Sequence, residues 1–495
     1  MENELTSLRG ALDLIRNDPA QYVETDIEAD PYLEIAGAYK KVGSGGTVRR
    51  PTKCNGPVMM FNNIKGYPGA RVVIGVLGSR KRMGIFTGTP PDQLAFKLSN
   101  CVNAPIPPVL VPAEKALCQQ VVHRADDPDF DIRKILPVAT TCSADPSPCI
   151  TMGLCRAQDP ETGHSDVTMH RMFVQDIRDE ISILADPKIN RHIGMMIDKA
   201  EKMNVPLPIT VNIGLDPAIY MCTSFTAPTT PFGYDELTIA GALRGKPVEL
   251  AQCLTINTAG IANAEYVIEG EVLPGRRVME DKLTGSGNGL AEFPGYTNVA
   301  HLVYVIKIKA ITHRIDPIYQ TCIGPSEEHV TMAGIPVEAC ILNLTGKSLP
   351  GRVKNVYSHS SGGGKFMAIM QISKEAPPHE GMQRQAALIA FSAFRELKHV
   401  ILVDDDVDVF DSSDVMWAMN TRYQGNIDTV FIPGISAHSA DPSACPEYSP
   451  FSRSPGASCK TLFDCTVPFD LKDKFKRPEF EDVDVDKFLP GFDLS

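Results

Sequence analysis

The stretch SDVTMHRMFV, residues 165–174, has the composition of a β-strand, because its valines, methionines and phenylalanine favour strands and no Gly or Pro interrupts it. It also carries Asp166, His170 and Arg171. Either it is an edge strand with ordinary surface charges, or it lines a site that holds an anion or a metal ion. Side chains of a regular β-strand alternate between its two faces, which puts Asp166 and Arg171 on opposite faces. A single site therefore needs a twist or bulge in the strand, or a metal at its end.

Further short apolar runs follow this stretch between residues 121 and 324. They are LPITVNIG (207–214), VELAQCLTI (248–256), AEYVIEGEVL (264–273) and LVYVIKIKAITHR (302–314). Many short strands at close spacing predict a barrel or a sandwich. Two segments with helical periodicity interrupt them, one capped by Asp186 and one that runs from Asp235 to Gly245.

The flanking segments predict a mixed α/β (α+β) protein. Residues 1–120 combine helices with short apolar strands and Gly/Pro punctuation, and residues 325–495 alternate strand and helix. The acidic run at residues 404–408 lacks the central glycine and closing glutamate of a calcium loop, so we expect a strand end followed by a helix cap.

The composition indicates a cytoplasmic enzyme of two or three domains. A chain of 495 residues is too long for one ordinary core. Its net charge of -12 and the lack of a Lys/Arg stripe disfavour nucleic-acid binding. No run approaches the ~20 apolar residues of a membrane helix, and the acidic amphipathic N-terminus is no signal peptide. Thirteen cysteines, an odd number, suggest reduced thiols.

Three residues that lie far apart in the sequence would together suit a hard cation. His192 faces the packed side of its predicted helix, where a histidine is more often a hydrogen-bonded core residue than a ligand. Glu236 lies in a first helical turn, which favours a carboxylate without any function. With Asp166 they would form a mixed O/N site for manganese or magnesium, but sequence spacing does not show that they meet.

Glu292, in the segment GLAEFPGYTN (289–298), is a candidate general acid. An apolar surrounding raises the pKa of a carboxyl group towards neutrality, which proton transfer requires. An exposed glutamate on a surface turn explains the local sequence equally well. The glycine- and base-rich segments 43–51 and 75–86 lack the spacing of a phosphate loop and are expected to be ordinary loops.

The chain resembles the UbiD family of prenylated-FMN-dependent (de)carboxylases along nearly its whole length, and its AroY-type protocatechuate branch most. Stretches that carry the resemblance include SDVTMHRM (165–172), INRHI (189–193), PTTPFGYDELTIAGALRGKPVEL (228–250), EFPGYTN (292–298) and, for the branch, GPSEEHVTMAG (324–334). The resemblance implies an N-terminal α/β region (1–120), a central split β-barrel that binds the flavin (121–324) and a C-terminal α/β domain (325–495). The C-terminal domain would mediate homo-oligomerisation, as a dimer or hexamer.

The resemblance also implies a cofactor site. Three side chains would hold Mn²⁺ (or Mg²⁺), through which the cofactor phosphate binds: Asp166, His192 and Glu236. K⁺ is also typical of the family. Thr168 and the backbone near Met169 would contact the phosphate, and further cofactor contacts would come from Arg171, Arg191, His192 and Lys365. A flavin prenyltransferase would supply the prenylated FMN.

Arg171 matches the family arginine that faces both the substrate carboxylate and the catalytic glutamate, which is Glu292 here. After CO2 leaves, Glu292 would protonate the same ring carbon. Many relatives have a second acid five residues before the catalytic glutamate, where this chain has Gly287. We therefore expect an incomplete Glu–Arg–Glu network, with Asn288 or Ser286 as substitutes.

His329 and His438 match pocket residues and are candidates to bind a phenol, unless they are solvent-exposed loop histidines. The favoured substrate, a small aromatic carboxylic acid, is 3,4-dihydroxybenzoate, converted to catechol. Gallate, 4-hydroxybenzoate and vanillate are alternatives, and the physiological direction stays open. An ordinary FMN oxidoreductase is disfavoured because no nicotinamide fingerprint is present. A non-catalytic carboxylase subunit is disfavoured because the metal and acid positions are retained.

Overall fold

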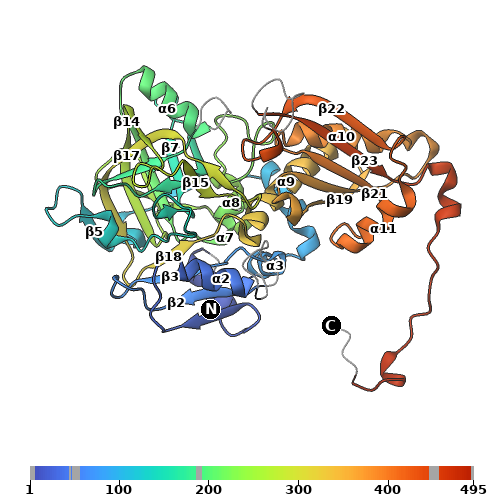
Figure 1. Cartoon of the computed structure of the whole chain (residues 1–495), viewed down its shortest axis with the longest axis horizontal. Helices are drawn as coiled ribbons and strands as arrows, with labels where there is room; N and C mark the ends of the chain where they lie inside the picture. The colour runs from blue at the N-terminus through green and yellow to red at the C-terminus, as the bar shows by residue number, and fades with distance from the viewer. Residues whose placement is uncertain (1–5, 44–45, 47–55, 186–191, 445–455, 492–495) are drawn as a thin grey trace.

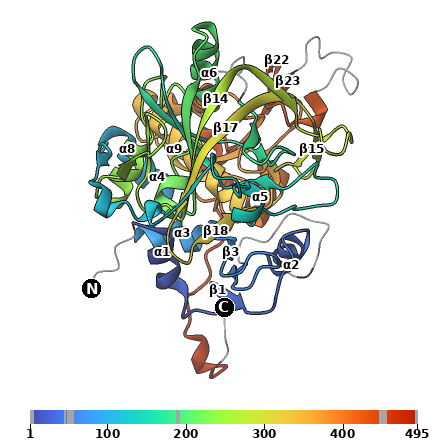
Figure 2. The same ribbon diagram turned by 90° about the vertical axis from the view of Figure 1, so that its left-hand side faces the viewer.

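A seven-stranded antiparallel sheet forms the centre of the computed structural model, which describes residues 6–43, 46, 56–185, 192–444 and 456–491. The strand order is β10-β17-β14-β11-β7-β8, and β5 pairs with β17. The strands are β5 (Val121–Arg124), β7 (Leu154–Gln158), β8 (Ser165–Met169), β10 (Glu180–Ile183), β11 (Leu207–Ile213), β14 (Tyr266–Met279) and β17 (Leu302–His313). The long strands β14 and β17 run side by side (Figures 1 and 2). Their β-branched residues pack into one buried core, as the apolar runs predicted.

The stretch 165–174 forms two strands instead of the predicted one. β8 ends at Met169, and β9 (Met172–Phe173) pairs in a separate small sheet with β6 (Cys149–Ile150). His170 and Arg171 lie in the link between the two strands. Strict alternation therefore does not apply across the link, and Asp166 and Arg171 line neighbouring cavities without a bulge.

The N-terminal region contains a four-stranded sheet of order β1-β2-β3-β18, drawn below the central sheet in Figure 1. Its strands are β1 (Tyr22–Thr25), β2 (Val58–Phe61), β3 (Arg71–Ile74) and β18 (Ile318–Thr321). The helices are α1 (Leu8–Ile15), α2 (Glu34–Gly43), α3 (Arg80–Thr87) and α4 (Leu94–Asn103). β18 follows the central sheet in sequence yet pairs with β3, so the two regions share a strand.

The C-terminal region contains a five-stranded sheet of order β19-β20-β21-β23-β22. Its strands are β19 (Val353–Ser358), β20 (Met367–Ile372), β21 (His399–Asp404), β22 (Thr429–Ser436) and β23 (Ala457–Cys465), and its helices are α9 (Glu327–Ser348), α10 (Met382–Ala393) and α11 (Ser412–Arg422). β20 and β21 pair in parallel across α10, which confirms the strand–helix alternation. β21 ends at Asp404, Arg422 binds Asp404 and Asp406, and Asp411 caps α11, as expected for a strand end and helix cap.

Two helices next to the central sheet carry predicted site residues. α6 (His192–Lys202) begins at His192, and the expected cap Asp186 lies outside the described residues. α8 (Leu237–Arg244) ends at Gly245, as predicted, and this glycine has a left-handed conformation (φ 71°). Asp235 accepts a hydrogen bond from the Leu237 backbone (2.9 Å), so α8 begins two residues later than predicted. The mixed α/β class is confirmed. Among the described helices, none is long and apolar enough to cross a membrane.

Candidate active site

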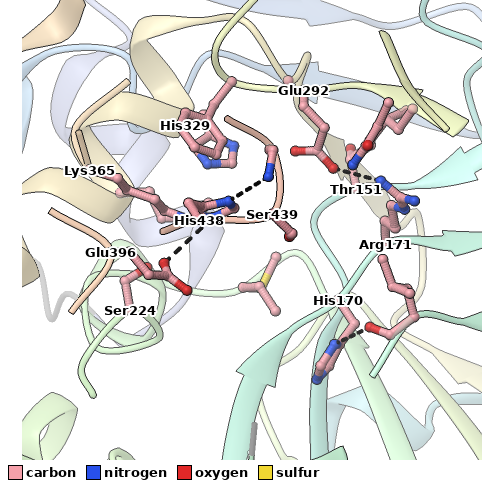
Figure 3. A pocket seen from close by; sticks show the side chains of 18 of the residues that line it. Thr151, His170, Arg171, Ser224, Glu292, His329, Lys365, Glu396, His438 and Ser439 are labelled. Carbon is pink, nitrogen blue, oxygen red and sulfur yellow. Dashed lines mark hydrogen bonds and ion pairs between the residues drawn. The ribbon is translucent and has the colours of Figure 1, made fainter. Parts of the chain in front are cut away.

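A cavity of about 290 Å³ lies between the central and C-terminal regions. Figure 3 shows Arg171 and Glu292 on one side of it and His329, Lys365 and His438 on the other. The first two belong to the central region, in the β8–β9 link and in the hairpin of β15 (Asn288–Ala291) and β16 (Thr297–Val299). The other three come from α9 and from the loops before β20 and after β22. Tertiary folding thus brings together five residues that the sequence singled out.

Arg171 is buried between two glutamates. Its Nε and Nη2 donate to both carboxylate oxygens of Glu280 (2.8 and 2.7 Å), and its Nη1 donates to Glu292 (2.8 Å). The backbone N–H of His301 also donates to Glu280 (2.9 Å). Burial opposes the charge of Arg171, but the hydrogen bonds and charges of both glutamates outweigh it and raise its pKa. The arginine is therefore held charged and oriented.

The expectation of an incomplete network at Gly287 is wrong. The second acid is Glu280, which directly follows β14 and is twelve positions before Glu292. Gly287 itself has a positive φ (76°), and its N–H donates to Asp281. The intervening residues form a turn that returns the chain to the hairpin, so neither Asn288 nor Ser286 is needed. Spacing in the sequence could not reveal this arrangement.

Asp166, His192 and Glu236 converge: one candidate ligand atom from each lies within 4.8 Å of the others. Nδ1 of His192 is 2.8 Å from Oδ1 of Asp166, and Thr168 donates to the other Asp166 oxygen (2.9 Å). Burial and the charge of Asp166 raise the pKa of Glu236, whose Oε2 has no hydrogen-bond partner among the described residues. Two buried carboxylates and an imidazole fit a hard divalent cation, which would satisfy that orphaned oxygen.

This cluster lines a second cavity of about 300 Å³, to which Arg395 of the C-terminal region also contributes. Both cavities are lined by Thr168, Thr223 and Thr226, so they are neighbours. Met169 lines the first cavity only. The pair of cavities can therefore take an elongated ligand with an anionic group at the metal cluster and a planar group beside Arg171.

The two candidate histidines both line the first cavity, which excludes the alternative of two solvent loops. His329, in the first turn of α9, stacks on Phe293 (5.3 Å between centroids). Burial, helped by the charge of Lys365, lowers the pKa of His329 well below its usual value, so its imidazole is neutral. Nδ1 of His438 accepts a hydrogen bond from the Ala440 backbone (3.0 Å), and its Nε2 is 3.5 Å from Glu396. Both nitrogens of His438 thus face protein groups.

Sequence reasoning missed three residues of this site: Glu280, Phe293 and Glu396. Glu280 and Glu396 look like ordinary charged residues after a strand and a helix, and Phe293 looks like one more apolar residue. The apolar neighbour Phe293 was the one available signal, because it prompted the choice of Glu292. Arg191, a predicted cofactor contact, lies outside the described residues.

Models of three domains of 3-octaprenyl-4-hydroxybenzoate carboxy-lyase match the chain: the N-terminal domain (16–102), the Rift-related domain (109–327) and the C-terminal domain (330–465). The gallate decarboxylase of Lactiplantibacillus plantarum (strain ATCC BAA-793 / NCIMB 8826 / WCFS1) is 48% identical over 99% of this chain and 100% of its own length.

Two solved structures are similar over nearly the whole chain. The apo 3,4-dihydroxybenzoic acid decarboxylase from Enterobacter cloacae is 51% identical, with a TM-score of 0.91 over 98% of this chain and 99% of its own. An evolved dimeric form of HmfF from Pelotomaculum thermopropionicum, in complex with prFMN, is 31% identical, with a TM-score of 0.81 over 99% of each chain. With three family domains in order and relatives of this identity, the chain belongs to the UbiD family and is a carboxy-lyase, as its motifs predicted.

Proposed function

We propose that this chain removes CO2 from a hydroxylated aromatic acid, with 3,4-dihydroxybenzoate as the favoured substrate and catechol as the product. One observation carries the proposal: a single cavity has a fixed guanidinium and a carboxylic acid at one end and a neutral imidazole and an ammonium at the other. The first pair suits a carboxylate and the second a phenol. A para-hydroxybenzoic acid bears these two groups at opposite ends of one ring.

Prenylated FMN would bind across the two cavities. Asp166, His192 and Glu236 would hold Mn²⁺ or Mg²⁺ at its phosphate, and Thr168 lies between that cluster and the ring-sized cavity. The bound cofactor would supply the electron sink that loss of CO2 requires. The complex of the family member HmfF with prFMN supports a prenylated flavin as the cofactor here. A flavin prenyltransferase, K⁺ and a homo-oligomeric state complete the proposal.

The two glutamates have different duties. Glu280 is buried and accepts three hydrogen bonds, two of them from Arg171, so it orients that guanidinium. Glu292 accepts one side-chain bond, from Arg171, and its side chain is 20% exposed to the cavity. It can therefore rotate, hold a proton and deliver it to the ring carbon after CO2 has left. Arg171 meanwhile binds the substrate carboxylate.

At the other end, His329 is the better base for the phenol. Its imidazole is neutral and lines the cavity, whereas both nitrogens of His438 face other protein groups. Lys365 lines the same wall and would stabilise a developing phenolate. His438 and Glu396 shape this end and limit which ring substituents fit.

The test is product formation from 3,4-dihydroxybenzoate, gallate, 4-hydroxybenzoate and vanillate, with enzyme made with and without a co-expressed flavin prenyltransferase. We expect catechol from 3,4-dihydroxybenzoate, only when the prenyltransferase is present. Preferred turnover of gallate, which the 48% identical relative favours, would keep the class and change the substrate. Two outcomes would contradict the proposal. One is turnover by enzyme that holds ordinary FMN, and the other is that enzyme loaded with prenylated FMN converts none of the four acids.

A further inference from the structure

Phe293 directly follows Glu292 at the tip of the β15–β16 hairpin and is 5% exposed. The hairpin belongs to the central region, but the Phe293 ring is inserted into the C-terminal region. It stacks on His329 (5.3 Å), meets the edges of Phe366 (5.1 Å) and His438 (4.9 Å), and lies 4.9 Å from Nζ of Lys365. Within the described residues, every ring and cation contact of Phe293 thus comes from beyond residue 326.

A glycine makes room for this ring. A Cβ atom at Gly363 would lie 2.1 Å from Cδ2 of Phe293, far inside van der Waals contact. Two residues earlier in the hairpin, a Cβ atom at Gly324 would lie 1.9 Å from the Ala291 carbonyl oxygen. Residues 291 and 293 are therefore each approached at a distance that only glycine permits.

Glu292 lies between these two points of close approach. Its side chain is held by Arg171, and its backbone N–H donates to the Tyr296 carbonyl within the same hairpin (2.9 Å). Neither bond fixes the hairpin relative to the wall that carries His329 and Lys365. The packing of Phe293 does, and adjacent Cα atoms are only about 3.8 Å apart, so a shift of the ring moves the acid with it.

We propose that Phe293 is a positioning residue that ties Glu292 to the C-terminal region, so that the acid and the phenol-binding wall keep one fixed separation. The role of Glu292 as proton donor rests on the proposed function; the attachment of the hairpin does not. In this arrangement the packing of Phe293 holds Glu292 at the substrate carbon that must be protonated, while Arg171 binds the substrate carboxylate.

The experiment perturbs the contact from both sides, with Phe293→Ala, Gly363→Ala and the double variant in the full-length enzyme loaded with prenylated FMN. We expect Phe293→Ala to lower kcat by about a hundredfold, the loss that misplacement by an ångström causes, with little change in KM. Proton delivery then limits the rate, so the solvent deuterium isotope effect on kcat rises. Phe293→Leu keeps part of the apolar contact and should restore part of kcat.

Gly363→Ala displaces the ring and should lower kcat in the same way. In the Phe293→Ala background the same change meets no ring and should cost far less, so the two losses are not additive. Gly351→Ala is the matched control, since Gly351 also has a positive φ (76°) but no atom within 4 Å of a Cβ. It carries the backbone strain alone and should leave kcat unchanged.

Amide hydrogen exchange of residues 288–299 gives a readout that needs no turnover. Phe293→Ala and Gly363→Ala should both speed exchange in this hairpin, and Gly351→Ala should not. Unchanged hairpin exchange, or fully additive losses in the double variant, would overturn the inference. If no aromatic acid is turned over but exchange responds as expected, the proposed function fails and the attachment of the hairpin stands.

Discussion

At the scale of single residues, the site depends on three charged groups whose duties differ through their contacts. Glu280 is fixed by Arg171 and by a backbone N–H, whereas Glu292 shares one bond with the same arginine and faces the cavity. In the proposed function, the same residue type serves in one place as an anchor and in the other as a proton carrier. Burial and hydrogen bonding decide which.

Substitution of either glutamate should separate these duties. Glu292→Gln removes the proton and should lower kcat by about 10² to 10⁴ with KM nearly unchanged. Glu280→Gln loosens Arg171 and should raise KM as well as lower kcat. Glu271→Gln, on β14 and paired with Lys309 at the surface, should change neither kcat nor KM. Steady-state kinetics check this, and equal kcat losses with an unchanged KM in both site variants would contradict the division.

The pH profile should report the charge beside His329. Burial and Lys365 keep the pKa of His329 well below 6.5, so the neutral base persists in mildly acidic solution. Removing the ammonium by Lys365→Met makes protonation of His329 easier. The acid limb of kcat/KM should therefore move to higher pH in the variant. Lys398→Met, which removes an ammonium paired with Asp441, is the control. An equal shift of the acid limb of kcat/KM in this variant would exclude a local effect of Lys365 on His329.

At the scale of elements, a break in one strand places two functions side by side. The link between β8 and β9 lets Asp166 join the candidate metal cluster while Arg171, five residues later, binds Glu280 and Glu292. α6 and α8 then bring His192 and Glu236 to Asp166. His192 is the first residue of α6, and Glu236 is the N-cap residue of α8.

Removal of a ligand should weaken metal binding even without turnover. His192→Ala and Glu236→Gln should each raise the Kd for Mn²⁺ by at least about tenfold, as measured by calorimetry. Asp166→Asn keeps an oxygen donor and should have a smaller effect. Asp159→Asn is the matched control, because Asp159 holds α6 through Lys199 without belonging to the cluster. Binding that is equally weakened by Asp159→Asn would indicate a structural effect on α6.

At the scale of the whole molecule, the cavity lies where the central and C-terminal regions meet. Buried polar contacts span the boundaries: Arg80 of α3 binds Glu338 of α9 through two hydrogen bonds of 2.8 Å, and Glu328 accepts from the backbone of Gly75 and Leu77. Phe293 adds an apolar contact across the boundary between the central and C-terminal regions. The N-terminal region therefore holds the helix that carries His329, although no catalytic candidate comes from that region.

The sequence by itself determined the fold class, most strands and helices, and the family, because apolar periodicity and contiguous motifs are local properties. It also singled out Glu292, Arg171 and the Asp–His–Glu set. Tertiary structure alone decided that the strand breaks at His170 and that Glu280 completes the network across a twelve-residue excursion. It alone showed that Phe293 is inserted between the regions. Such contacts join residues that are distant in the sequence and meet only when the chain folds. No regular spacing in the sequence therefore predicts them.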